Sequence, residues 1–149
     1  MEKIDETDMN ILREFQKNAR QSFREVAENL GVSEGTVYNR VNKLKEQGVI
    51  KGFIVDVDYA KLGYDLTAII GIIVTGGKLS EIEGRLAKEE EITAVYDVTG
   101  RYDAIAVAKF SSSDALNDLV KRIQRLPNVE RTYTMVALNT VKEAHGVKL

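Results

Sequence analysis

The feature that most constrains this chain is the short distance between the end of one predicted helix and the start of the next. Ser22 and Glu25 form a capping box, which begins a helix, and Gly31 is a residue type that commonly ends one. Ser33, a preferred N-cap residue, follows after Val32 alone. Two helices joined by so short a turn cross at a large angle, which predicts a helix-turn-helix unit.

Apolar residues at helical spacing support these two helices and predict a third before them. Asp5 is the expected N-cap of the first helix, which should end near Asn18, and Gly48 follows the last helix. Each helix has one apolar stripe that would face a shared core: Ile11, Leu12 and Phe15 in the first, Phe23, Val26, Ala27 and Leu30 in the second, and Val37, Val41 and Leu44 in the third.

The opposite face of the third predicted helix suits a DNA groove. No acidic residue occurs from Gly35 to Lys45, and Glu34 at the helix start could accept from cytosine or only complement the helix dipole. A solvated face of an ordinary three-helix unit would show the same pattern. The candidate DNA contacts are side chains that read base edges or bind phosphate, with their neighbours: Ser33, Glu34, Gly35, Thr36, Tyr38, Asn39, Arg40 and Lys43.

The charge of the whole chain argues weakly against a nucleic-acid partner, but its distribution does not. The net charge is -2 and the pI about 5.6, whereas DNA-binding domains are often basic. Residues 38–51 nevertheless carry one acidic side chain, Glu46, against Arg40, Lys43, Lys45 and Lys51. So modest a positive field predicts that tight DNA binding also needs base contacts and the pairing of two chains.

The rest of the sequence predicts a βαββαβ order. Strands are expected at 65–75, 92–99, 103–110 and 129–140, with helices begun by a Ser80–Glu83 capping box and by the serines at 111–113. Another strand, a wing or a connecting ribbon, is expected at 49–58. The predicted class is α+β, in which a winged helix-turn-helix domain (1–52), a connecting strand and linker (53–64), a ferredoxin-like domain (65–141) and a tail (142–149) follow one another.

The strand at 65–75 is apolar on both of its faces, although the two helices of a ferredoxin-like domain cover one face only. The other face therefore needs a cover, and a second copy of the chain would make a symmetric homodimer. The N-terminal half of the same chain is the alternative cover. In a dimer, two recognition helices held roughly 34 Å apart could read successive major-groove faces.

A second candidate site lies in the predicted turn between the middle strands. An amino acid needs an anion for its ammonium group and donors for its carboxylate, which Asp103 and the region of Gly100 could supply. An ordinary hairpin turn with solvated Arg101 and Asp103 explains the same residues more simply. The candidate effector residues come from this turn and from the last strand: Thr99, Gly100, Arg101, Tyr102, Asp103, Thr132, Tyr133 and Thr134.

Composition excludes several other classes of protein. The chain has no cysteine and one histidine, so we expect no disulfide, no metal site, no cofactor and no nucleophile–base pair of an enzyme. No apolar run reaches about 18 residues and the start lacks a signal-peptide pattern, so a cytoplasmic protein without a membrane partner is expected. A chromatin-like architectural protein and a small-molecule sensor that does not bind DNA are the remaining alternatives to a regulator.

The run from Leu30 to Phe53 resembles the helix-turn-helix signature of the Lrp/AsnC (leucine-responsive, feast/famine) regulators. The start from Ile4 to Leu12 and the turn Thr99-Gly100-Arg101-Tyr102-Asp103 are also similar to that family, so the resemblance spans about Ile4 to Val141. It implies a transcriptional regulator that dimerises through the connecting strand and effector sheets, and that often assembles into tetramers or octamers.

The resemblance also implies an effector, commonly an amino acid, bound between dimers near the Gly-x-Tyr-Asp turn. Carried over, Thr99, Gly100, Tyr102 and Asp103 would line that pocket, with residues 132–134 opposite. Arg101 departs from the family pattern, in which this position is often acidic. An added cation disfavours the ammonium group of a ligand, which implies an acidic effector, one of a different kind, or none.

Overall fold

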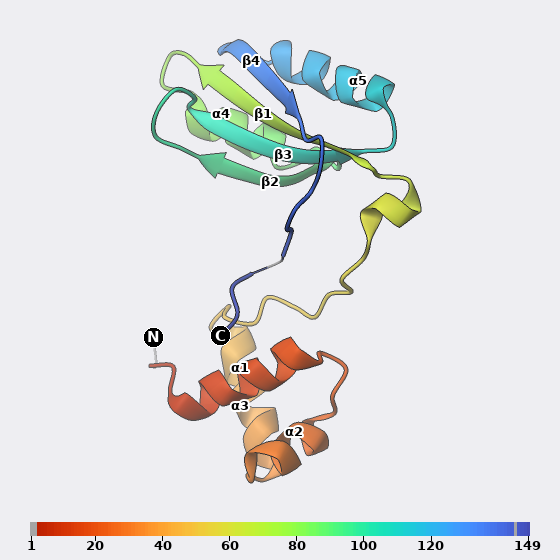
Figure 1. Ribbon diagram of the computed structural model, residues 1–149. Helices are drawn as coiled ribbons and strands as arrows, with labels where there is room; N and C mark the ends of the chain where they lie inside the picture. The colour runs from red at the N-terminus through yellow and green to blue at the C-terminus, as the bar shows by residue number, and fades with distance from the viewer. Residues whose placement is uncertain (1–2, 145) are drawn as a thin grey trace. The chain divides into compact units, whose positions relative to one another are not determined.

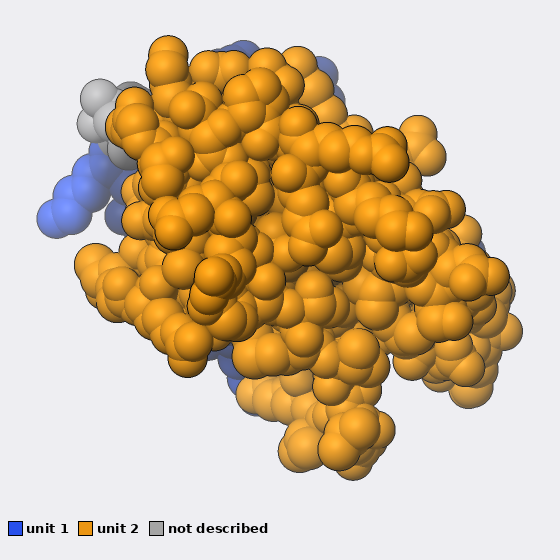
Figure 2. Space-filling view, turned by 90° about the horizontal axis from the view of Figure 1, so that it is seen from above, with its two compact units in different colours: residues 1–56, 143–149 blue, residues 57–142 orange. Residues whose placement is uncertain are grey.

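A computed structural model describes residues 3–144 and 146–149 (Figure 1). The chain forms two compact units, which Figure 2 colours separately: residues 1–56 with 143–149, and residues 57–142. The division after residue 56 falls within the segment expected to be a linker. The C-terminal tail belongs to the same unit as the N-terminal helices, although it follows the last strand in sequence.

The first unit contains the three expected helices, α1 (Glu6–Lys17), α2 (Phe23–Leu30) and α3 (Glu34–Glu46). Asp5, Ser22 and Ser33 are their N-caps, and α1 and α2 both begin with a capping box. The apolar stripes meet in one core, as their spacing predicted: Ile11, Phe15, Val26, Ala27, Val37 and Val41.

The strand expected at 49–58 is not formed, because this segment joins no strand ladder within the described part of the chain. A β-strand needs a ladder partner for its backbone groups. The segment nevertheless exposes apolar side chains, with Ile54 67% and Val55 80% exposed.

The second unit has the predicted βαββαβ order after a 3-10 turn at Tyr59–Leu62. Its antiparallel sheet has the strand order β2-β3-β1-β4. The elements are β1 (Leu66–Val74), α4 (Leu79–Leu86), β2 (Ile92–Asp97), β3 (Ala104–Phe110), α5 (Ser113–Gln124) and β4 (Val129–Val136).

Two boundary predictions in this unit were wrong. Helix α4 begins at Leu79 after Lys78, with no side-chain cap, so the proposed Ser80–Glu83 capping box is not formed. Ser80 already lies inside the first turn, where it cannot act as the N-cap. Strand β4 ends at Val136 rather than at 140, because Val136 is its last residue paired with β1.

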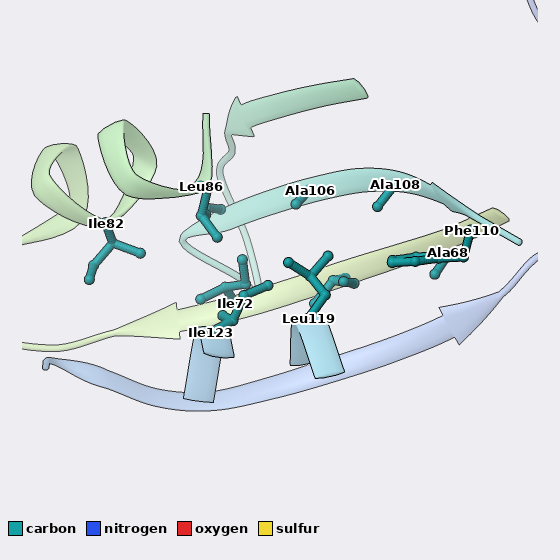
Figure 3. Close-up of a cluster of buried hydrophobic side chains, with 11 residues drawn as sticks. Ala68, Ile72, Ile82, Leu86, Ala106, Ala108, Phe110, Leu119 and Ile123 are labelled. Carbon is teal, nitrogen blue, oxygen red and sulfur yellow. The ribbon is translucent and has the colours of Figure 1, made fainter. Parts of the chain in front are cut away.

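The core of this unit lies between one face of the sheet and the two helices (Figure 3). Alternate residues of β1 and β3 point into it, which follows from the period-two alternation of a strand. The cluster contains Ala68, Ile70, Ile72, Ala104, Ala106, Ala108 and Phe110 from the strands, and Ile82, Leu86, Leu119 and Ile123 from the helices.

The opposite face of the sheet, called the open face here, is only partly covered within one chain. The strand register places its side chains in two cross-strand rows: Tyr96, Ile105, Gly71 and Tyr133 in one, and Ala94, Val107, Ile69 and Met135 in the other. Tyr96 is 57% and Met135 44% exposed. This apolar face is where the sequence predicted a partner.

Candidate functional site

The turn between α2 and α3 is held by backbone hydrogen bonds that set the crossing of the two helices. Gly31 adopts a left-handed conformation with φ 65°, which an L side chain rarely adopts. The amide of Val32 donates to the carbonyl of Ala27 at 3.0 Å, and that of Thr36 donates to Ser33 Oγ at 3.1 Å. The local sequence thus ends α2 and begins α3 within three residues.

Helix α3 buries Val37, Val41 and Leu44 completely and presents its other side outward. The candidate DNA contacts gather on that outer side and at the helix start. Ser33, Glu34, Gly35, Tyr38 and Asn39 are exposed, while Thr36, Arg40 and Lys43 are half-buried. The surface therefore offers hydroxyl, amide and ammonium groups on a short, rigid element.

Arg40 is placed differently from its neighbours. Its guanidinium donates to the carboxylates of Asp5 and Asp8, at 3.1 Å to Asp8 Oδ1. Asp8 is fully buried and also accepts from the amide of Asp5 at 3.1 Å. Arg40 thus joins α3 to the capping box of α1, and its contact with DNA stays a prediction.

Tyr38 has a packing role as well as an exposed surface. Its ring meets that of Phe23 edge-on with centroids 6.1 Å apart, which ties α3 to α2. Phe15 continues this contact, 6.1 Å from Phe23 and 5.3 Å from Phe53. More than half of Tyr38 remains exposed, so the side chain is fixed in place at the surface of α3.

The turn between β2 and β3 is stabilised by Asp103. Its carboxylate Oδ2 accepts from the amide of Val74 at 2.7 Å, and its own amide donates to the carbonyl of Ile72 at 3.0 Å. These bonds hold the turn against the irregular end of β1, where the pairing with β4 shifts register. Thr99 and Gly100 are exposed at its tip.

Tyr102 lies flat against the sheet because the strand beneath it has a glycine. A Cβ atom at Gly71 would be 2.8 Å from the ring of Tyr102, a distance too short for any side chain. The ring of Tyr133 lies beside it, with centroids 5.4 Å apart. A glycine inside a predicted strand can signal such a close approach, so Gly71 is the residue of the sequence that points to this contact.

Two arginines meet at Tyr133. Arg131 donates to the Tyr133 hydroxyl at 3.3 Å, and the Arg101 guanidinium lies 4.7 Å from the centre of its ring. Hydrogen bonds from Arg131 and then Arg101 lower the pKa of Tyr133, because they favour the phenolate. Arg131 was not among the predicted site residues, and its contact with Tyr133 two residues along β4 is what brings it to the site.

The predicted effector residues of β4 lie on two faces of the sheet, and their part in effector binding stays a prediction. Thr132 is paired with Ile72 and Thr134 with Ile70, so both threonines lie on the helix-covered face. Thr132 accepts a hydrogen bond there from Gln124 of α5 at 2.9 Å. Tyr133 alone joins Tyr102 on the open face, because neighbouring residues of a strand point to opposite sides.

No group of three or more metal-binding side chains occurs among residues 3–144 and 146–149. In the same part of the chain, no helix combines the length and apolar character needed to cross a bilayer.

Comparison with known proteins identifies both units. A family model for a winged helix-turn-helix DNA-binding domain matches residues 4–51, and one for the Lrp/AsnC ligand binding domain matches residues 67–147. An uncharacterised HTH-type transcriptional regulator of Pyrococcus furiosus is 50% identical over 140 residues, which cover 94% of this chain and 95% of that protein. The chain belongs to the Lrp/AsnC family.

Two further Lrp/AsnC proteins extend this likeness. Regulatory protein AsnC of Haemophilus influenzae is 35% identical, with 93% of each chain covered. The solved structure of Escherichia coli AsnC superposes with a TM-score of 0.89 at 33% identity, covering 99% of this chain and 100% of that one. The resemblance inferred from sequence is confirmed, and the protein is a DNA-binding transcriptional regulator with a ligand-binding domain, not an enzyme.

Proposed function

We propose that this protein binds specific promoter DNA as a dimer, and that a small effector molecule, an amino acid or a related compound, changes its assembly or DNA affinity. The observation that carries the proposal is the outer side of α3. It exposes Asn39 and Tyr38 opposite three fully buried core residues, on a helix that a glycine turn fixes against α2. Amide and ammonium groups there suit base edges and phosphates.

Two features of the single chain support the dimer. The open face of the sheet leaves Tyr96 and Met135 about half exposed, and the segment before the second unit exposes Ile54 and Val55. A second copy would cover both groups of apolar side chains. The same pairing would present two α3 helices to one DNA duplex, and further association into tetramers or octamers would use other surfaces. We also propose that this DNA-binding regulator acts in the cytoplasm.

The test is a titration of the full chain against its own promoter and against unrelated DNA of equal length. We expect tighter binding to the promoter, with an affinity that falls steeply as salt rises, because phosphate contacts release counterions. Asn39→Ala should weaken promoter binding by about tenfold or more while leaving binding to unrelated DNA unchanged.

Lys121→Ala is the matched control, since this exposed residue lies on α5 in the other unit. Equal affinity for both DNAs would contradict specific regulation and favour an architectural role. An unchanged promoter affinity in Asn39→Ala would show that α3 does not read bases through this residue.

A further inference from the structure

Two arginines of the second unit lie beside one tyrosine. Arg101 comes from the turn between β2 and β3, and Arg131 from β4. Both side chains are directed at Tyr133, one at its ring and one at its hydroxyl. Among the residues that the structure describes, neither arginine forms an ion pair with an aspartate or glutamate side chain, although the Glu130 carboxylate beside Arg131 in sequence attracts it electrostatically.

The aromatic rings hold this pair of charges in place. The Arg101 guanidinium lies 4.7 Å from the Tyr133 centroid and 5.8 Å from the Tyr102 centroid, so both rings contact it. Tyr102 is itself fixed over Gly71. Stacking on two rings restricts a long side chain before a ligand arrives, which lowers the entropy lost on binding.

The hydrogen-bonding capacity of the two guanidiniums is largely unused. Each carries five N–H donors, whereas the Tyr133 hydroxyl offers only a neutral oxygen. The lowered pKa of Tyr133 has the same origin, since both arginines favour negative charge at that point. A carboxylate would accept two parallel N–H bonds from a guanidinium, a stronger interaction than a phenol provides.

We propose that Arg101, Arg131 and Tyr133 form the recognition site for a small dicarboxylate, with or without an α-amino group. This proposal rests on the regulatory function above and specifies the chemistry of its effector. A zwitterion without net charge brings an ammonium group that two guanidiniums repel. An acidic amino acid or a simple dicarboxylate stays net negative and can place one carboxylate against each arginine or both on one.

The first experiment is a thermal-shift and calorimetric titration of the full chain. The probes are L-aspartate, L-glutamate, succinate and glutarate at millimolar concentration, with L-asparagine and L-glutamine as amide controls. A ligand that binds the folded state raises the unfolding temperature. We expect the acids to raise it and the amides, which replace one carboxylate, to leave it unchanged.

The four acids also distinguish an acidic amino acid from a dicarboxylate that has no amino group. A shift with aspartate or glutamate alone identifies an acidic amino acid. A shift with succinate or glutarate as well identifies dicarboxylates in general. No shift with any of the four acids, or equal shifts with asparagine and glutamine, would overturn the proposal.

Substitutions assign the binding to this cluster. Arg101→Gln and Arg131→Gln should each weaken binding of the effective acid by about tenfold or more, because each removes a charge-assisted hydrogen bond. Arg125→Gln is the matched control, since this exposed arginine caps the end of α5 in the same unit. Circular dichroism should be unchanged in all three variants.

Unchanged affinity in both Arg101→Gln and Arg131→Gln would refute the assignment. The assignment would also be refuted if the chain bound none of the acids and the two variants sedimented differently from the unaltered chain. In that case the cluster would be a contact between copies of the chain. Promoter binding is measured in parallel. If the chain binds the promoter specifically but binds none of the acids, only the inference about the effector is contradicted. If it binds an acid but no promoter DNA, only the proposed regulatory function is contradicted.

Discussion

Arg40 couples α3 to the beginning of α1. Its guanidinium contacts both Asp5 and Asp8, and Asp8 is completely buried. A buried carboxylate without a partner is costly, so the arginine stabilises the fold at this point. It also consumes one of the four basic charges between residues 38 and 51, which makes the positive field at α3 weaker than the sequence suggests.

Arg40→Ala should lower the free energy of unfolding by about 1–3 kcal/mol, because Asp8 keeps only its backbone partner. Urea denaturation followed by circular dichroism measures this. Arg24→Ala is the control, since its ion pair with Glu28 is exposed and should contribute less than about 0.5 kcal/mol. Equal stability of the two variants would mean that the Asp8 carboxylate does not depend on Arg40. DNA binding by Arg40→Ala is measured under conditions in which the variant is fully folded, so that a weaker affinity is not caused by unfolding.

Asp5 should make the stability of the first unit depend on pH. The amide of Asp8, followed by the Arg40 guanidinium, holds the pKa of Asp5 below its ordinary value. The folded state therefore gains stability from ionised Asp5 above pH of about 4, and loses it as the pH falls below that value. In Asp5→Asn, which keeps an N-cap side chain, the unfolding free energy should fall less on acidification. Urea titrations at neutral and acidic pH compare the two, and identical losses would contradict this role.

At the scale of elements, the two faces of β1 carry side chains of different size. On one face its large side chains fill the core between sheet and helices. On the other, Gly71 leaves the space in which the ring of Tyr102 lies. This arrangement ties the turn between β2 and β3 to the middle of the sheet, so the turn is more rigid than its glycine content suggests.

Gly71→Ala should destabilise the protein by about 1–3 kcal/mol, because its Cβ would collide with the Tyr102 ring at 2.8 Å. Gly84→Ala is the matched control. This glycine lies in α4 with no atom within 4 Å of an added Cβ, so alanine should stabilise by about 0.5–1 kcal/mol. Thermal unfolding of both variants tests the contrast. A neutral Gly71→Ala would show that Tyr102 can move away freely.

For the whole molecule, the two units carry different tasks and the chain passes between them twice, near residues 56 and 142. The tail after the second passage contacts α1, where Gln16 donates to the carbonyl of Val147 and accepts from the amide of Leu149. The first unit offers the DNA surface, while the second offers the ligand-binding domain and an apolar open face.

Met135→Asp should shift the protein toward monomers in sedimentation velocity, because a charge in the apolar row of Ile69 and Val107 would be buried in a dimer. Thr134→Asp, one residue away on the other face of β4, should leave the assembly unchanged. If Met135→Asp sediments like the unaltered chain, the open face is not the dimer contact. A monomer that still binds the promoter as tightly would contradict the need for paired α3 helices.

Local sequence determined the parts of this protein that depend on neighbouring residues. Caps at Asp5, Ser22 and Ser33, the glycine at position 31 and the apolar stripes predicted three helices and their turn, because capping and periodicity act within a few residues. The same reasoning predicted the βαββαβ order and the two candidate surfaces. It failed at Ser80, where a cap motif does not begin the helix.

Only the tertiary structure decided which side chains meet across elements. It engaged Arg40 with the start of α1, divided residues 132–134 between two faces, and brought Arg131 to Arg101 around Tyr133. It also left residues 49–58 outside any strand ladder within the described part of the chain. The physical reason is that strand register and helix packing join residues far apart in sequence, and local periodicity contains no information about those pairings.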